Sequence, residues 1–243
     1  MIVSDVMTTR LITVVPDDTL SHAANLLRQY QFHHLPVVRT APAFGSMYTS
    51  QSKHPELEGL LTSQDIDMAA AVGTSSSDIL RQSWGERRVL EVMHRAIIRV
   101  TPTTSVAAAA QILVERGLNC LPVVEYERAE HPSGEQEDEA LTRPLLVGLL
   151  TRSDLLMALA RSLGAFEPGM QLSISLPMGD LTPLAKTLTL AAELHIQVRS
   201  VLAAPLEGKV PLTATVRLGT IHPAPLLARL QEEHIDYAAG EAQ

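Results

Sequence analysis

The chain has 243 residues and a formal net charge of −8, with 46% hydrophobic but only 3% aromatic residues. This length is enough for one large domain or for two to three small ones, whose cores must be built from aliphatic side chains. The negative charge argues against sequence-independent binding of nucleic acid, which needs clustered Lys and Arg. A lone cysteine, Cys120, excludes an internal disulfide, and no run of about 18 apolar residues predicts a membrane span. We therefore expect a globular protein of the reducing cytoplasm.

The first part of the chain contains an internal repeat. Residues 3–38 align with residues 89–124 at an offset of 86, and 13 of these 36 positions are identical. Residues 59–65 then align with residues 148–154 at an offset of 89, as Gly-Leu-Leu-Thr-Ser-Gln-Asp and Gly-Leu-Leu-Thr-Arg-Ser-Asp. The change of offset falls in a predicted loop, where insertions are tolerated. The chain therefore carries a duplicated unit.

Each copy predicts the same order of elements: a short helical turn, a strand, a helix, two further strands and a last helix. The first helix places Leu20, Ala23, Ala24 and Leu27 at helical spacing. The turns end at Met7 and Met93, and the helices that follow the first strands begin after the N-caps Thr19 and Ser105. The three predicted strands of each copy are 11–15, 35–38 and 59–62 in the first and 97–101, 121–124 and 148–151 in the second. The last helices start near Asp65 and Asp154. An acidic run within residues 125–142 predicts a solvated loop.

The chain changes character after Gly164. Residues 171–177 and 212–218 alternate apolar and polar side chains, which is the period of a strand. The remaining predictions are a helix whose apolar face runs from Leu181 to Ala192, a strand at 198–204, a helix at 223–234 and an edge strand at 235–239. The resulting order, βαββαβ, is the ferredoxin-like pattern.

A threonine and an aspartate stand at the end of the third strand in both copies, as Thr62 with Asp65 and as Thr151 with Asp154. Polar side chains and free N–H groups at a strand–helix junction can hold hydroxyls and phosphates. The same two residue types are also common helix caps. Their recurrence at both junctions favours a binding site over a purely structural cap.

The sequence lacks the usual motifs of catalysis and metal binding. It contains no GxxxxGK[ST] phosphate loop and no GxSxG elbow. Its nine histidines show no HExxH spacing, and one cysteine excludes a thiolate zinc site. His33 and His34 precede the second strand, where they could line a cleft, but adjacent side chains point to opposite faces of a strand, which favours a packing role over a metal pair. We expect no catalytic residue, no metal ion and no cofactor.

These features resemble a tandem pair of cystathionine-β-synthase (CBS) domains over residues 1–162. The resemblance rests on Leu-Pro-Val-Val in the second strand and on Gly-Leu-Leu-Thr-x-x-Asp in the third strand of both repeats. The residues after 170 resemble an ACT domain in their βαββαβ order and in the turn Pro-Met-Gly-Asp at 177–180. The implied fold class is α/β (α+β), with CBS repeat 1 at 1–72, a linker at 73–88, CBS repeat 2 at 89–163 and a ferredoxin-like, ACT-like domain at 170–243.

The resemblance implies clefts between the repeats for an adenosine-containing ligand, such as AMP, ADP, ATP or S-adenosylmethionine. Asp65 and Asp154 match the family's aspartate, which accepts hydrogen bonds from ribose hydroxyls. Thr62 and Thr151 match its threonine, which bonds the ribose or the phosphate. The other implied site residues are Ser153, Arg152, Thr13 and Arg99. Because Gln64 departs from the serine that the family often has before its aspartate, the second repeat is the stronger candidate.

The implied function is that of a regulatory sensor without catalytic activity, which forms a homodimer and acts on a separate target protein. The domain combination is similar to that of acetoin-utilisation proteins, which connects the sensor with acetoin or carbon metabolism. Two alternatives stay open. One is a structural or protein-interaction module with empty clefts. The other is an amino-acid sensor, in which Gly179 and Asp180 of the ACT-like turn approach the ligand.

Overall fold

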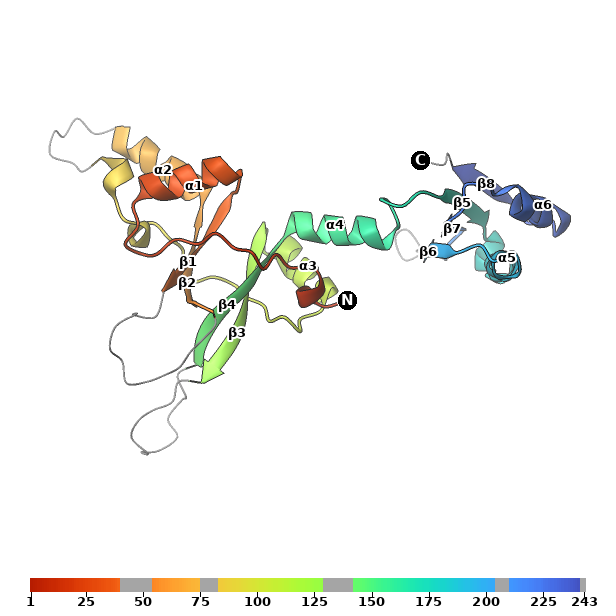
Figure 1. The fold of residues 1–243 in the computed structure, drawn as a ribbon, viewed down its shortest axis with the longest axis horizontal. Helices are drawn as coiled ribbons and strands as arrows, with labels where there is room; N and C mark the ends of the chain where they lie inside the picture. Colours follow the sequence, from red (N-terminus) through yellow and green to blue (C-terminus); the bar gives the residue numbers. More distant parts are fainter. Residues whose placement is uncertain (40–53, 75–82, 129–141, 204–209, 241–243) are drawn as a thin grey trace. The chain divides into compact units, whose positions relative to one another are not determined.

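The computed structural model describes residues 1–39, 54–74, 83–128, 142–203 and 210–240. The chain divides into two compact units, Met1–Leu155 and Leu156–Gln243, and the boundary falls inside helix α4 (Figure 1). Most of the acidic run predicted within 125–142 lies outside the described residues. Within those residues, no helix is both long enough and apolar enough to cross a membrane.

The N-terminal unit contains one four-stranded sheet, to which each repeat contributes an antiparallel hairpin. The strands are β1 (His34–Arg39), β2 (Glu56–Thr62), β3 (Cys120–Arg128) and β4 (Thr142–Thr151), in the order β1-β2-β4-β3. Both hairpins shift register at the same place, just before Val38 and just before Val124. They meet at the pair formed by Glu56 and Leu145. Strands β3 and β4 are longer than predicted, but the predicted segments lie within the observed strands.

The helices of this unit begin where the caps predict. Helix α1 (Leu20–Tyr30) is capped by Thr19, whose hydroxyl accepts from the His22 N–H at 3.2 Å. Ser105 caps α3 (Val106–Glu115) in the same way. The last helices, α2 (Ser63–Thr74) and α4 (Arg152–Ser162), follow β2 and β4 directly. Figure 1 shows α1 and α2 beside the β1–β2 hairpin, and α3 beside the β3–β4 hairpin.

The prediction of strands at 11–15 and 97–101 was wrong. In each copy one residue of this segment, Val14 or Val100, forms an isolated parallel bridge to the second predicted strand. The Val14 N–H donates to the Pro36 carbonyl at 3.1 Å, and the Val38 N–H donates to the Val14 carbonyl at 2.9 Å. A longer parallel ladder would need backbone N–H groups from Pro16 and Pro36, and proline has none. The second copy repeats this arrangement around Val100, again with prolines at the two limiting positions.

The segment that opens each repeat packs against the other repeat. The fully buried Val3 belongs to the core of the second repeat, whereas Val89 and Met93 belong to the core of the first. Beyond these turns, Thr8 pairs with Leu149 of β4, and His94 pairs with Leu60 of β2. The two repeats therefore exchange their opening segments. The predicted boundaries at 72, 88 and 163 describe repeats of the sequence, and their use as domain boundaries stays a prediction.

This exchange explains the glycine that opens each Gly-Leu-Leu-Thr run. A Cβ atom at Gly59 would lie 2.7 Å from the His94 carbonyl oxygen, and one at Gly148 would lie 2.5 Å from the Met7 sulfur. Real Cβ atoms do not approach other heavy atoms so closely. Glycine at these positions lets the opening segment of the partner repeat cross directly over the strand.

The C-terminal unit has the predicted βαββαβ order. Its elements are β5 (Met170–Ser175), α5 (Thr182–Glu193), β6 (Val198–Leu202), β7 (Thr213–Leu218), α6 (Ala224–Glu232) and β8 (Tyr237–Gly240). All neighbouring strands are antiparallel, and the order β6-β7-β5-β8 places β8 at an edge, as predicted. The core is aliphatic and includes the fully buried Leu172, Ile174, Leu226 and Leu230. The ferredoxin-like fold is therefore confirmed, while membership of the ACT family stays a prediction.

Candidate functional site

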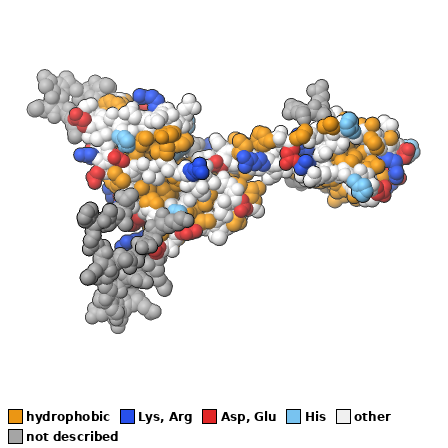
Figure 2. Space-filling model, viewed as in Figure 1, with side chains coloured by type: hydrophobic (Ala, Val, Ile, Leu, Met, Phe, Trp, Pro, Cys, Tyr) orange, Lys and Arg blue, Asp and Glu red, His pale blue; other side chains and the backbone are white. Residues whose placement is uncertain are grey.

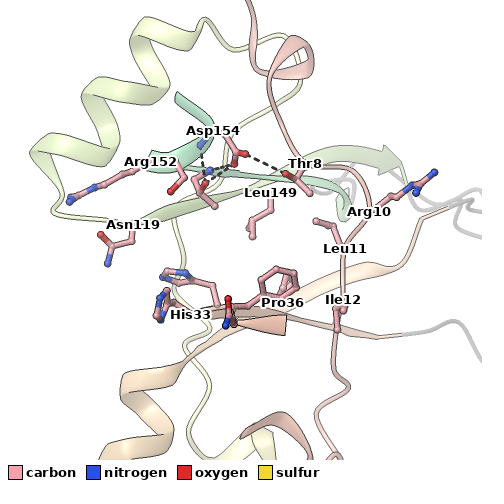
Figure 3. A pocket seen from close by; sticks show the side chains of 15 residues that line it. Thr8, Arg10, Leu11, Ile12, His33, Pro36, Asn119, Leu149, Arg152 and Asp154 are labelled. Carbon is pink, nitrogen blue, oxygen red and sulfur yellow. Dashed lines mark hydrogen bonds between the residues drawn. The ribbon is translucent and has the colours of Figure 1, made fainter. Parts of the chain in front are cut away.

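A cavity of about 480 Å³ lies inside the N-terminal unit. Four parts of the chain line it: the segment Thr8–Ile12 except Thr9, the start of β1 with the residues before it, Asn119 just before β3, and the junction of β4 with α4. Figure 3 shows Thr8, Leu149 and Asp154 on one wall, with His33 and Pro36 on the opposite wall. Both repeats therefore contribute to one cavity, which includes Thr151, Arg152, Ser153 and Asp154.

At the junction, Thr151 and Asp154 bond one another in both directions. Asp154 Oδ2 accepts from the Thr151 backbone N–H at 2.8 Å and from its hydroxyl at 2.7 Å. The Asp154 N–H donates to the Thr151 hydroxyl oxygen at 3.2 Å. This is the reciprocal arrangement of a capping box, and it fixes the carboxylate at the N-terminus of α4. The prediction that these residues cap a helix and the prediction that they face a cleft are thus compatible.

The second carboxylate oxygen of Asp154 is the one available to a ligand. Its described partner is the Thr8 hydroxyl, which donates to Oδ1 at 3.4 Å (Figure 3). That distance is well beyond the 2.5–2.7 Å of a strong hydroxyl–carboxylate bond. An ionised carboxylate oxygen held at the edge of a cavity can accept hydrogen bonds from the hydroxyls of a bound molecule.

The cavity carries more cationic than anionic groups. Arg10 and Arg152 line it, and Figure 3 shows both side chains extending away from Asp154. The Arg152 guanidinium donates to the Leu113 carbonyl at 3.4 Å, so it is only weakly held in place. His33 and His34 also line the cavity, and burial, with a smaller contribution from His33, lowers the pKa of His34. The pair thus lies at the candidate site, whereas the sequence favoured a packing role.

The matching aspartate of the first repeat lies outside this cavity. Asp65 and Thr62 form the same capping box, with the same distances of 2.8, 2.7 and 3.2 Å. Asp65 lines a separate depression of about 330 Å³ with Arg87, His94 and three apolar residues. There the His94 Nε2 lies 2.8 Å from Asp65 Oδ1.

The other predicted site residues are dispersed. Thr13 and Arg99 line neither of these cavities. In the C-terminal unit, Asp180 accepts from the Thr182 N–H and hydroxyl at 2.9 and 2.6 Å, and these bonds lower its pKa. Gly179 has a φ of 80° and lies against Val210. The structure thus gives both turn residues a local structural role, and their binding of an amino acid stays a prediction.

Sequence reasoning missed several residues of the larger cavity. Thr8, Arg10, Phe32 and Asn119 line it but belong to no motif. The alignment of the two repeats contained one usable signal. It places Asn119 opposite His33, so that both residues lie just before the second predicted strand of their repeat. Among the residues that the structure describes, no cluster of His, Cys, Asp and Glu is arranged to hold a metal ion.

Cys120 is buried at the start of β3, and this has a measurable consequence. Burial raises the pKa of its thiol to about 12. Because the thiolate is the reactive species, we expect the folded protein to react with a disulfide reagent at pH 8 on the order of 1,000-fold more slowly than the unfolded chain. Absorbance of the released thiol, measured with and without guanidinium chloride, checks this. Equal rates in both conditions would contradict it.

Comparison with known proteins agrees with the repeat and the fold. Residues 3–71 and 89–134 match the family model of the CBS domain. The N-terminal unit is a pair of CBS domains. A similar curated protein is the CBS domain-containing protein YhcV of Bacillus subtilis, which is 29% identical over 123 residues, covering 51% of this chain and 72% of YhcV.

Solved structures similar to this CBS pair include a putative acetoin utilization protein, AcuB, from Vibrio cholerae. It is 22% identical, covers 68% of this chain and 93% of its own, and gives a TM-score of 0.47. Another is CBSX2 in complex with AMP, with 22% identity, coverage of 66% and 96%, and a TM-score of 0.43. These likenesses concern the fold and leave the ligand of the present CBS pair to be argued from its own residues.

Proposed function

We propose that the CBS pair is a non-catalytic regulatory sensor that binds an adenosine-containing nucleotide in the cavity beside Asp154. The observation that carries this proposal is the carboxylate itself. Asp154 lines a cavity of about 480 Å³ and is fixed by Thr151 through one oxygen, while its other oxygen has one weak partner among the described residues. A ribose offers two neighbouring hydroxyls, and charge-assisted bonds to a carboxylate are about twice as strong as neutral ones.

The charges around the cavity favour an anionic ligand. Two guanidinium groups line it, against the one carboxylate of Asp154, and the lowered pKa of His34 favours a neutral imidazole there. Phosphate groups pair with arginine in a geometry that a neutral nucleoside cannot use. This balance supports AMP, ADP or ATP over S-adenosylmethionine, whose sulfonium group is a cation. The apolar residues Leu11, Ile12 and Phe32 supply the surface on which a base can pack.

The test is thermal unfolding of the purified protein with AMP, ADP, ATP, S-adenosylmethionine and a set of amino acids. A ligand present at 100 times its Kd stabilises the folded state by about 2.7 kcal/mol. For a chain of this size we expect a rise in Tm of about 5–10 °C. A rise with an adenosine phosphate supports the proposal. No rise with any adenosine compound overturns it, and a rise with an amino acid alone favours sensing by the C-terminal unit.

The output of the sensor is part of the same proposal. Helix α4 begins at the ligand site and continues into the C-terminal unit, so ligand contacts at its first turn are covalently connected to that unit. A ligand transmits a signal only if it binds one arrangement of the protein better than another. We propose that this signal reaches a separate target protein in carbon metabolism, within the cytoplasm.

We further propose that the protein acts as a homodimer. Helix α4 exposes Leu156 (67%) and Leu159 (56%), and Figure 2 shows hydrophobic side chains at its surface. Contiguous exposed apolar surface is typical of interaction sites. The molar mass in solution, measured by light scattering with and without nucleotide, tests the dimer. If this mass is that of one chain at micromolar concentration in both conditions, the homodimer is excluded.

A further inference from the structure

The two aspartates of the CBS pair differ at one oxygen. In both, Oδ2 accepts from the threonine N–H at 2.8 Å and from its hydroxyl at 2.7 Å, and the aspartate N–H donates to the threonine hydroxyl oxygen at 3.2 Å. At Oδ1, Asp154 has the Thr8 hydroxyl at 3.4 Å, whereas Asp65 has the His94 imidazole nitrogen at 2.8 Å. At the carboxylate itself, the two sites therefore differ in one partner side chain.

Thr8 and His94 occupy equivalent positions in the duplicated sequence. Each lies in the opening segment of one repeat and pairs with the third strand of the other, Thr8 with Leu149 and His94 with Leu60. The backbone bonds of both pairs run in both directions at 2.9 Å. Since the backbone positions match, the contrast comes from the side chains themselves and can be exchanged by mutation.

The two side chains have opposite effects on a ligand. A threonine hydroxyl at 3.4 Å is a weak partner that leaves Oδ1 open to the hydroxyls of a ribose. An imidazole nitrogen at 2.8 Å satisfies Oδ1 at the distance of a charge-assisted bond. The Asp65 side chain is 12% exposed. To replace His94 at Oδ1, a ligand hydroxyl must displace the ring, whose side chain is 60% exposed.

We propose that His94 takes the place of a ligand at Asp65 and closes the first-repeat site, so that each CBS pair binds one nucleotide. This inference rests on the proposed function and adds its stoichiometry and the residue that sets it. The closed site retains a cation, because Arg87 lines the same depression, where it pairs with Glu91 at 3.0 Å. Removal of the imidazole therefore exposes a second site with the same carboxylate chemistry.

The test exchanges the two side chains. Isothermal titration calorimetry with AMP, ADP and ATP measures the number of nucleotides bound per chain by the full-length protein, by His94→Thr and by Thr8→His. We expect one nucleotide for the unaltered protein, two for His94→Thr and none for Thr8→His. Thermal unfolding without ligand verifies that each variant is folded. If Thr8→His fails to fold, His94→Thr decides by itself.

The outcomes separate this inference from the function on which it rests. Two nucleotides bound by the unaltered protein would overturn the role of His94 and leave the nucleotide sensor intact. One nucleotide bound by both the unaltered protein and His94→Thr would do the same. If neither protein binds a nucleotide, both proposals fail. A nucleotide bound by His94→Thr alone would support the role of His94 and would show that the proposed site beside Asp154 is wrong.

Discussion

Asp154→Ala is expected to lower the affinity for the nucleotide about 100-fold. The substitution removes the carboxylate that we propose accepts hydrogen bonds from both ribose hydroxyls, and a hydrogen bond to a charged group contributes about 1.5–3 kcal/mol. Two such bonds correspond to about 3 kcal/mol or more, which is about 100-fold in Kd. Calorimetric titration of the variant with the nucleotide that binds the unaltered protein measures this loss.

Asp65→Ala is the matched control for this prediction. It deletes the same side chain from the same capping box, so both variants lose a helix cap that stabilises by about 1 kcal/mol. We expect a drop in Tm for both variants, slightly larger for Asp65→Ala because it also loses the bond to His94, and a loss of nucleotide affinity in Asp154→Ala alone. An affinity that falls in Asp65→Ala and survives in Asp154→Ala would show that the first repeat holds the ligand.

Leu150→Ala is expected to destabilise the N-terminal unit by about 3–5 kcal/mol. Leu150 lies in β4, is fully buried and belongs to the core of the second repeat. Truncation of such a side chain removes its transfer free energy and leaves a cavity that the surrounding structure fills only in part. The corresponding fall in Tm is about 10 °C, measured by calorimetry.

Leu61 and Val114 provide the comparisons for Leu150. Leu61 is the equivalent residue of β2 and is also fully buried, so Leu61→Ala should cost a similar amount. Val114 is 76% exposed on α3, and surface substitutions usually stay within about 0.5 kcal/mol. An effect of Leu150→Ala no larger than that of Val114→Ala would contradict the burial of β4 in this core.

Most of what could be predicted about the N-terminal unit followed from its internal repeat. Helix caps such as Thr19 and the strands that end at Thr62 and Thr151 follow from local pattern and occur as expected. The failure at residues 11–15 has a local cause as well. The run Leu-Ile-Thr-Val-Val is rich in strand-forming residues, but the prolines at 16 and 36 remove the N–H groups that a ladder needs.

The exchange of opening segments could not be predicted from the sequence. Val3 and Val89 are the same residue in the same local pattern, and either repeat's core would accept either side chain. The sequence therefore contains no signal that distinguishes packing within a repeat from packing between repeats. For the same reason the contact of Thr8 with Asp154 could not be predicted, because Thr8 lies beside Asp154 only when the opening segments are exchanged. A residue that belongs to no motif can then contact the carboxylate that we propose binds the ligand.

The exchanged segments also bear on how the protein is synthesised. Val89 and Met93, which are buried in the first repeat's core, leave the ribosome after all other residues of that core. Until they emerge, β2 lacks the segment that pairs with Leu60 and covers Gly59. Val3, in turn, can become buried only after the second repeat has been synthesised. The two CBS domains therefore complete their folding together, and neither half of the duplicated chain is a complete folding unit when it is made alone.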